Sequence, residues 1–325
     1  MTDFKNRVFG CAVVKAVNSN YNADFSGQPR TLPSGVVYAT DKAFKYTVKN
    51  YLKYVYSDKE YVLYFKRYKE EFIPFDLTEA YKEKFRTEVK NDKPEVIARN
   101  ILSCIDVRIF GATFAPKGDG VKGKSISVHG PVQINHGVNV WKENNIYTEQ
   151  ITSPLRNPDD KKGDKQATTL GRQSKLEEGH YLHHFSVNPL NLRDIVDIAY
   201  LKAKEGELNF NDEEIQQLSS EDIEKLKEAM RRGATWYDSA SKAGCENEML
   251  VWVQLNSESK IVLPNFSTLI ELKSEKEAGK CVYDFALLTA KLKTYSADIE
   301  SIEVYCNSDT VTVQNTPDGA EVKDI

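Results

Sequence analysis

VFGCAVVKAV, from Val8 to Val17, is the stretch that decides the fold class. Apolar side chains fill nearly every position, a pattern typical of a strand that is buried along most of its length. A polar loop follows, broken by glycine and proline up to Gly35. Asp41 then stands where a helix N-cap is expected, and Phe44, Val48, Tyr51 and Leu52 recur at helical spacing. The chain therefore begins as strand, loop and helix.

The rest of the chain alternates between predicted helices and predicted strands. A helix should open at Lys93-Pro94, and another at Ser219, which with Asp222 resembles a capping box, ending at Gly233. The predicted strands are Tyr61–Tyr68, Val107–Ala115, the alternating residues 126–134, His180–Val187, Met249–Leu255, Thr268–Leu272, Val282–Leu288, Ile299–Cys306 and Thr310–Val313. This order favours an α+β sandwich of the ferredoxin-like kind over a doubly wound sheet.

The stretch 141–179 lacks hydrophobic periodicity. It contains Pro154, Pro158, the run DDKKGDK from Asp159 to Lys165, and Gly171. We expect an exposed arm inserted into the core domain, because a structureless stretch of this length inside a compact domain is usually functional or disordered. The predicted organisation is thus one core domain made of residues 1–140 and 180–325, and an arm of residues 141–179.

Composition limits the classes of protein that the chain can belong to. Its 325 residues include five scattered cysteines with no paired spacing, which favours reduced thiols in a cytosol over a disulfide framework or a zinc ribbon. No apolar run is long enough to span a membrane, and no signal peptide is expected, so we predict a cytoplasmic protein. The net charge of −4 argues against a simple nucleic-acid binder, although a local basic stripe would suffice.

Catalytic motifs are scarce. The sequence has no phosphate-binding glycine loop, dinucleotide fingerprint, serine-hydrolase elbow or zinc-protease helix motif. The histidines His180, His183 and His184 form the one histidine cluster; on a strand the first and third would share one face and the second the other. They are either polar strand residues or, less often, a metal or acid–base site. Asp24 is either a turn residue or a general base or metal ligand.

Basic residues gather after the first strand. Lys42, Lys45, Lys49 and Lys53 share one helix face, and Arg30 lies in the preceding loop. Such a stripe is usually a solvated surface, but the loop and the helix N-terminus could together hold phosphate groups. The arm adds further cations, Lys161, Lys162, Lys165, Arg172 and Lys175, which could serve solubility or a basic finger.

Four segments together resemble a known family. They are VVKAVNSNYNADF (from Val13), PRTLPSGVVYATDKAFKYTVKNYL (from Pro29), DVRIFGATFA with SISVHGPVQI (from Asp106 and Ser125), and TLGRQSKLEEGHYLHHFSVNPLNL (from Thr169). In this order they are similar to the RAMP-superfamily backbone subunit of type I CRISPR Cascade complexes, most closely to its subtype I-B branch. The resemblance covers about the first two-thirds of the chain and the helix that ends at Arg231-Arg232-Gly233.

The resemblance implies an RRM-like palm with helical insertions and a protruding thumb, here the arm. It implies a non-catalytic subunit that binds guide RNA (crRNA), meets target DNA through the guide, and assembles with further copies of itself and with other Cascade subunits. No cofactor or metal is implied. The thumb's intercalating residue would be Ile151 or Leu155. The RNA-binding positions carried over are Asn18, Ser19, Arg30, Lys42, Lys45, Lys49, Phe110, Gly111, Thr113, Thr169, Gly171 and Arg172.

Two related enzymes remain alternatives. A type III backbone subunit would cleave target RNA with a loop aspartate, for which Asp24 is the candidate. A RAMP-type endonuclease that processes guide RNA would need a positioned base, and the histidine cluster supplies its only support.

Overall fold

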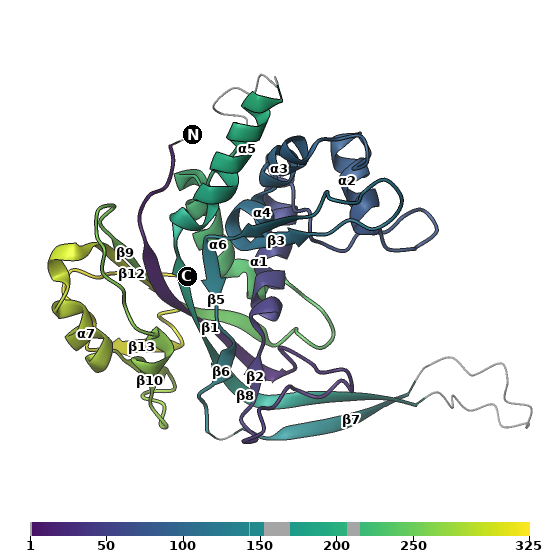
Figure 1. Ribbon diagram of the computed structural model, residues 1–325. Coiled ribbons are helices and arrows are strands. Elements are labelled where there is room, and N and C mark those ends of the chain that lie inside the picture. The colour runs from purple at the N-terminus through teal and green to yellow at the C-terminus, as the bar shows by residue number, and fades with distance from the viewer. Residues whose placement is uncertain (1, 143, 153–169, 207–214) are drawn as a thin grey trace, which may run out of the picture.

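The first strand lies at the centre of a nine-stranded sheet (Figure 1). In this computed structural model, which describes residues 2–142, 144–152, 170–206 and 215–325, β1 (Val8–Ser19) pairs antiparallel with β8 (Leu170–Val187) and β9 (Cys245–Leu255). The outer strands are β12 (Ile299–Cys306) and β14 (Glu321–Lys323) beyond β9, and β6 (Gly137–Asn139), β2 (Tyr38–Ala39), β5 (Val132–Ile134) and β7 (Ile146–Thr152) on the side of β8.

Both faces of the sheet are covered, which explains why β1 is almost wholly apolar. Val8, Ala12 and Val14 face a core shared with α1 (Asp41–Val55) and α6 (Ser220–Trp236). Phe9, Cys11 and Val13, which alternate with them, face a second core built with the C-terminal segment. A strand enclosed on two sides has no solvent face, so the alternating polar residues of a half-exposed strand are missing.

The connectivity confirms the predicted α+β fold. Four neighbouring strands lie in the order β6, β8, β1 and β9 across the sheet. Along the chain, α1 lies between β1 and β6, and α6 lies between β8 and β9. Numbered along the chain, this is the 2-3-1-4 order of the β-α-β-β-α-β unit, and every neighbouring pair is antiparallel. α1 and α6 pack closely: a Cβ at Gly233 would lie 2.8 Å from the carbonyl oxygen of Thr47.

Two further groups of elements flank the sheet. A helical group lies beyond α1, with a separate hairpin of two strands (Figure 1). It consists of α2 (Leu77–Phe85), α3 (Pro94–Leu102), α4 (Ile105–Phe110), β3 (Gly111–Phe114), β4 (Ile126–His129), the 3₁₀ turn η1 (Pro189–Leu192) and α5 (Arg193–Glu205). The C-terminal group holds η2 (Phe266–Thr268), β10 (Glu271–Leu272), β11 (Cys281–Asp284), α7 (Ala286–Lys293), η3 (Ser296–Asp298) and β13 (Val311–Gln314). No helix in the described ranges has the length and apolar character needed to cross a membrane.

Several predicted elements are confirmed and several are wrong. Pro94 opens α3, Ser219 and Asp222 form a true capping box, and β12 has the predicted bounds. The expected end at Gly233 is wrong, because α6 continues to Trp236 and the glycine instead permits close approach to α1. The N-cap of α1 is Thr40, and Asp41 is the first helical residue.

The strand predicted over Tyr61–Tyr68 is absent. The backbone N–H groups of Leu63 and Tyr64 donate to the buried carboxylate of Asp106, at 2.8 and 3.0 Å, and so do not join a strand ladder. The strand predicted over Val107–Ala115 is in fact α4 followed by β3. All six residues of α4 are buried, the charged Asp106 and Arg108 included, and a short segment buried on every side carries no period that separates helix from strand.

The C-terminal predictions also need correction. The predicted strand Val282–Leu288 ends at Asp284, whose carboxylate accepts a hydrogen bond from the backbone of Ala286 where α7 begins. Of the predicted strand Thr268–Leu272, only Glu271 and Leu272 form a strand, which is β10.

The arm contains more regular structure than its sequence suggested. β7 and the first part of β8 form a long antiparallel hairpin that projects away from the sheet (Figure 1). β8 is continuous from Leu170 to Val187 and therefore passes through the boundary set at residues 179 and 180. Nearly all of β7 is exposed, which is why the hairpin has no hydrophobic stripe.

Candidate nucleic-acid interface

The end of β1, the loop after it and the start of α1 are joined by side-chain hydrogen bonds. Asn22 in the loop accepts hydrogen bonds at its Oδ1 from the backbone N–H and the hydroxyl of Thr40, at 2.9 and 3.0 Å. Asn18, at φ 48°, accepts one from the hydroxyl of Tyr147 on β7 at 3.0 Å. Asn20 donates to the carbonyl oxygen of Ser174 on β8 at 3.1 Å. Loop, helix start and hairpin are thus held as one surface.

The lysine stripe of α1 divides into three environments. Lys42 is exposed and makes no ion pair within the described part of the chain. Lys45 bridges to Asp41 at 3.2 Å and lies 5.7 Å from the ring centre of Phe110. Lys49 bridges to Asp106 at 3.2 Å, with 15% of the lysine side chain and none of the aspartate exposed. Lys49 is therefore a partner in a structural ion pair. Its side chain is largely buried, whereas the sequence predicted it on a surface that faces RNA.

The N-terminus of α1 is not an open anion site. The Thr40 hydroxyl accepts a hydrogen bond from the backbone N–H of Ala43, as an N-cap does. The N–H of Asp41 donates to the imidazole of His136, and the Asp41 carboxylate adds negative charge at the same point. The N–H groups of Asp41 and Ala43 are therefore engaged within the chain, and phosphate binding at this helix end stays a prediction. Lys42 and Lys45 remain as the cations beside this helix end.

The loop residues Arg30 and Asp24 have different partners. The guanidinium of Arg30 donates to the carbonyl oxygen of Ala23 at 3.1 Å and lies 5.9 Å from the ring centre of the exposed Phe25. Asp24 accepts hydrogen bonds from the Ser26 hydroxyl and from two backbone N–H groups of its own loop. These hydrogen bonds lower the pKa of Asp24, and the bond from the Ser26 hydroxyl has the largest effect. Its carboxylate shapes the loop.

The junction of α4 and β3 is shaped by backbone contact. Gly111 has φ 71°, and a Cβ there would lie 2.3 Å from the backbone nitrogen of Gly130. The glycine at this position therefore admits another segment of this chain, the backbone at Gly130. Phe110 is nearly buried beneath Lys45, and Thr113 is exposed on β3.

Two of the predicted RNA-binding residues lie at exposed positions of the hairpin. Gly171 and Arg172 lie on β8 opposite Ile151 and Gln150 of β7, and Ile151 is exposed. Thr169 and the second intercalation candidate, Leu155, fall outside the described residues.

Ser19 is not presented to solvent. It is the last residue of β1, its side chain is 1% exposed, and its hydroxyl lies 3.4 Å from the sulfur of Cys245. The side chain is buried because β1 continues two residues past Val17, the expected end of the strand, and RNA binding at this position stays a prediction.

The histidine cluster is divided between the two cores, as strand alternation predicted. His183 stacks on Phe44 at 4.9 Å, and its Nε2 lies 3.3 Å from the Tyr21 hydroxyl. Burial lowers the pKa of His183 to about 4, so the ring is neutral near pH 7. His180 and His184 lie on the other face, against Tyr283 and Phe266. The three rings do not converge on one site.

Two residues at this surface were not singled out from the sequence. The side chain of His136 is 53% exposed, its ring packs at a tilt against Tyr38 with centres 5.4 Å apart, and it contacts Asp41 at the helix start. Lys242 donates to the carbonyl oxygens of Asn20 and Tyr21 at 3.2 and 2.9 Å, which fixes the chain just after β1. A lone histidine and a lysine far along the chain carry no spacing signal, so only the fold brings them here.

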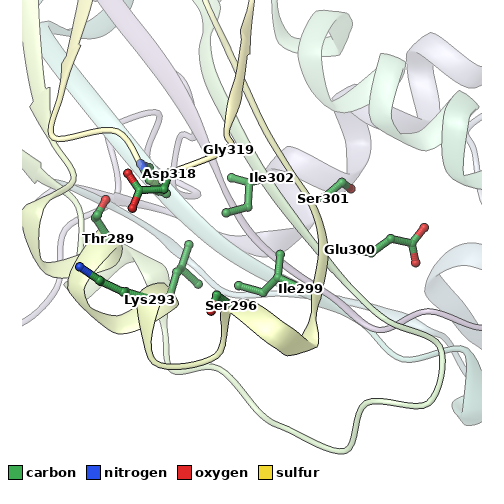
Figure 2. A pocket seen from close by; sticks show the side chains of 11 residues that line it. Thr289, Lys293, Ser296, Ile299, Glu300, Ser301, Ile302, Asp318 and Gly319 are labelled. Atoms are coloured by element: carbon green, nitrogen blue, oxygen red, sulfur yellow. The ribbon is translucent and has the colours of Figure 1, made fainter.

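A hollow of about 350 Å³ lies away from this surface (Figure 2). It is bounded by α7, η3, the start of β12 and residues 317–319. Figure 2 shows Glu300 and Asp318 at its rim with Lys293. Two carboxylates and one ammonium do not suit a polyanion, so this hollow is a poor candidate for RNA.

Comparisons with known proteins show a shared fold and a family. A chain of a solved structure titled "CRISPR RNA-guided surveillance complex, pre-nicking" has a TM-score of 0.52 and 13% identity, covering 98% of this chain and 96% of that chain. A chain titled "CRISPR RNA-guided surveillance complex" has a TM-score of 0.49 and 12% identity, covering 95% of each. No curated protein matches. The family described as CRISPR-associated protein Cas7 matches residues 6–290, most of the 325-residue sequence, and the chain belongs to that family.

Proposed function

We propose that this chain is the backbone subunit of a type I CRISPR surveillance complex, of the I-B branch. In this proposal several copies polymerise along a guide RNA, hold its phosphate backbone, and present its bases to target DNA together with other Cascade subunits. Membership of the Cas7 family supports the role, as does the fold shared with a chain of a CRISPR RNA-guided surveillance complex. A subunit that must accept any guide should contact phosphate and ribose and leave base edges free.

The observation that carries the proposal is the joining of the hairpin to the basic surface. Tyr147 and Ser174 of the hairpin bind Asn18 and Asn20 at the end of β1, so the hairpin leaves the sheet beside Arg30 and Lys42. An arm that projects from a cationic surface can close over a strand lying there. Because its described outer residues are exposed, such an arm has little role in the monomer and suits contact between neighbouring copies.

The proposal assigns no catalytic activity to the chain. The Asp24 carboxylate is engaged by its own loop, and His180 and His183 are buried in separate cores. These positions support a structural role. Substituting Asp24 by Ala should therefore leave guide binding intact, and a metal-dependent cleavage of target RNA that disappears in this variant would favour a type III subunit instead.

The test is assembly on RNA. The chain, co-expressed with its guide, should purify with RNA of uniform length in an assembly of several copies, measured by native mass spectrometry. Thr148 and Ser174 are cross-strand partners with hydroxyls 2.9 Å apart, so residues 149–173 can be replaced by an Asn-Gly turn without moving the strand ends. This variant should remain folded and bind short RNA, yet lose cooperative assembly on a long guide. Full assemblies formed by the shortened protein would contradict the proposal.

A further inference from the structure

A second cluster of polar side chains lies in the other core, on the face of β8 away from α1. His180 of β8 is fully buried between Glu248 of β9 and two residues of β11, Cys281 and Tyr283. Glu178, two residues before the histidine on the same face of β8, completes the group. None of these side chains belongs to the RNA surface, because that surface is built on the opposite face and on the loop after β1.

The histidine ring is held in one orientation by a carboxylate. Nδ1 of His180 lies 2.6 Å from Oε2 of Glu248, and the same oxygen accepts a hydrogen bond from the Tyr283 hydroxyl at 2.6 Å. An Nδ1–H that donates to Glu248 leaves Nε2 with its lone pair directed to the other side. Metal-binding histidines are typically fixed in this way, with one nitrogen on a carboxylate and the other on the metal.

Nε2 meets two further metal-binding atoms. It lies 3.3 Å from Oε1 of Glu178 and 4.0 Å from the sulfur of Cys281, and the three ligand atoms are all within 4.8 Å of one another. Tetrahedral zinc with ordinary bond lengths separates a nitrogen from an oxygen ligand by about 3.4 Å and from a sulfur ligand by about 3.6 Å. The three atoms therefore need only small side-chain movements to surround one ion.

The electrostatic environment favours a cation at this point. Two carboxylates, those of Glu178 and Glu248, lie within 3.3 and 2.6 Å of the nitrogens of the His180 ring. Oε1 of Glu248 is buried without a hydrogen-bond partner within the described residues. The ammonium of Lys276 lies 2.8 Å from Glu178, on a side chain 36% exposed, so it can move aside for a metal ion.

We propose that Glu178, His180 and Cys281 form a zinc site, with a water molecule as the fourth ligand. A thiolate, an imidazole and a carboxylate are the ligand types that zinc takes in proteins. On binding, the thiol of Cys281 gives up its proton to solvent, and the resulting thiolate and the Nε2 lone pair of His180 each form a bond to the ion. Glu248 acts as a positioning residue through the ring.

The consequence of the site is a cross-link between two parts of the fold. β8 belongs to the central sheet and carries the hairpin, whereas β11 belongs to the separate sheet of β10, β11 and β13. An ion shared by Glu178 and Cys281 would fix the C-terminal sheet to the strand that carries the arm. The site does not depend on the proposed RNA role.

The experiment uses the full chain with its affinity tag removed. The protein is stripped with a chelator, exposed to ZnCl₂ and dialysed, and bound zinc is measured by elemental mass spectrometry alongside the melting temperature. Cys281→Ser and Glu178→Gln remove single ligands. Cys306→Ser is the matched control, because Cys306 is another buried, unpaired thiol of the same core.

Wild type and the control should bind about one zinc per chain and melt at a higher temperature with zinc than without it. Both ligand variants should lose at least tenfold in zinc affinity. With Co²⁺ as the probe, the thiolate-to-metal absorption band should appear in wild type and be absent in Cys281→Ser. Wild-type protein that takes up no zinc would overturn the proposal, as would zinc uptake retained in both ligand variants. Glu178 is partly exposed, so its variant should fold even if the serine variant does not.

Discussion

Lys42 and Lys49 allow a test that separates RNA contact from folding within one helix. They lie seven residues apart on α1, and the sequence alone gives them the same role. Substituting each by Met keeps the aliphatic stem and a good helix former while removing the charge. We expect Lys42→Met to weaken RNA binding without changing stability, and Lys49→Met to lower stability without a specific effect on RNA.

The expected loss of stability follows from the ion pair of Lys49 with Asp106. At 3.2 Å and an effective dielectric constant near 20, opposite unit charges attract by about 5 kcal/mol. Asp106 keeps its two backbone hydrogen bonds after the substitution, and Lys49 is partly exposed, so the net cost should be ~2–3 kcal/mol. For a chain of 325 residues this corresponds to a melting temperature lower by about 3–4 °C.

The expected loss of binding follows from counterion release. Removal of one phosphate contact on a single strand lowers the slope of log affinity against log salt by about 0.7. The assays are fluorescence anisotropy with a labelled spacer RNA at four salt concentrations and thermal melting of the free protein. If Lys49→Met lowered the slope while its melting temperature stayed at the wild-type value, the assignment of the two lysines would be wrong.

Three further perturbations have defined outcomes. Gly111→Ala should lower the free energy of unfolding, measured with denaturant, by at least ~2 kcal/mol, because φ is 71° and the added Cβ would meet Gly130. The control Gly118→Ala should lower it by less, because Gly118 is also at positive φ but faces open space. Arg108→Lys should lower the free energy of unfolding by about 3 kcal/mol, because the guanidinium binds Asp222, Glu60 and two carbonyl oxygens in a buried site. The control Arg193→Lys, at an exposed position, should change it by under ~0.5 kcal/mol. Wild-type protein should lose stability as the pH falls from about 6.5 to about 4, because burial lowers the pKa of His183 to about 4 and the unfolded state takes up the proton first. Melting curves of His183→Phe should show a smaller loss of stability over the same pH range.

The core of the fold could be predicted because its signals are local. β1 is apolar on both faces, and the capping box of α6 lies within four residues, so each can be recognised without knowledge of distant segments. Failures occurred where a distant residue decides the local structure. The segment at Leu63 is not a strand because Asp106, far along the chain, takes its N–H groups. The hairpin was missed because nearly all of β7 is exposed, which leaves that strand without a hydrophobic period.

The sequence locates the basic residues of the candidate site but not their partners within the fold. Sequence spacing puts Lys42, Lys45 and Lys49 on one helix face, and the structure does so too. Spacing cannot show which of these charges already has a partner within the fold. Asp41 lies on the same helix and partners Lys45, whereas Asp106 partners Lys49 from another element. Availability for RNA is therefore a tertiary property.

An acidic chain can still leave cations free at one surface when its acidic groups pair with other cations inside the fold. Many of its cations are paired internally, among them Arg108 with Asp222, Lys225 with Glu60, and Lys227 with Glu303. Such pairs are buried or nearly so, and they contribute nothing to the field that a ligand meets at long range. The cations that matter are those left outside these pairs beside the hairpin, so the net charge of −4 says little about affinity for RNA. If the chain polymerises on RNA as proposed, it has a further reason for modest charge, because each copy would neutralise only the few phosphates that it covers.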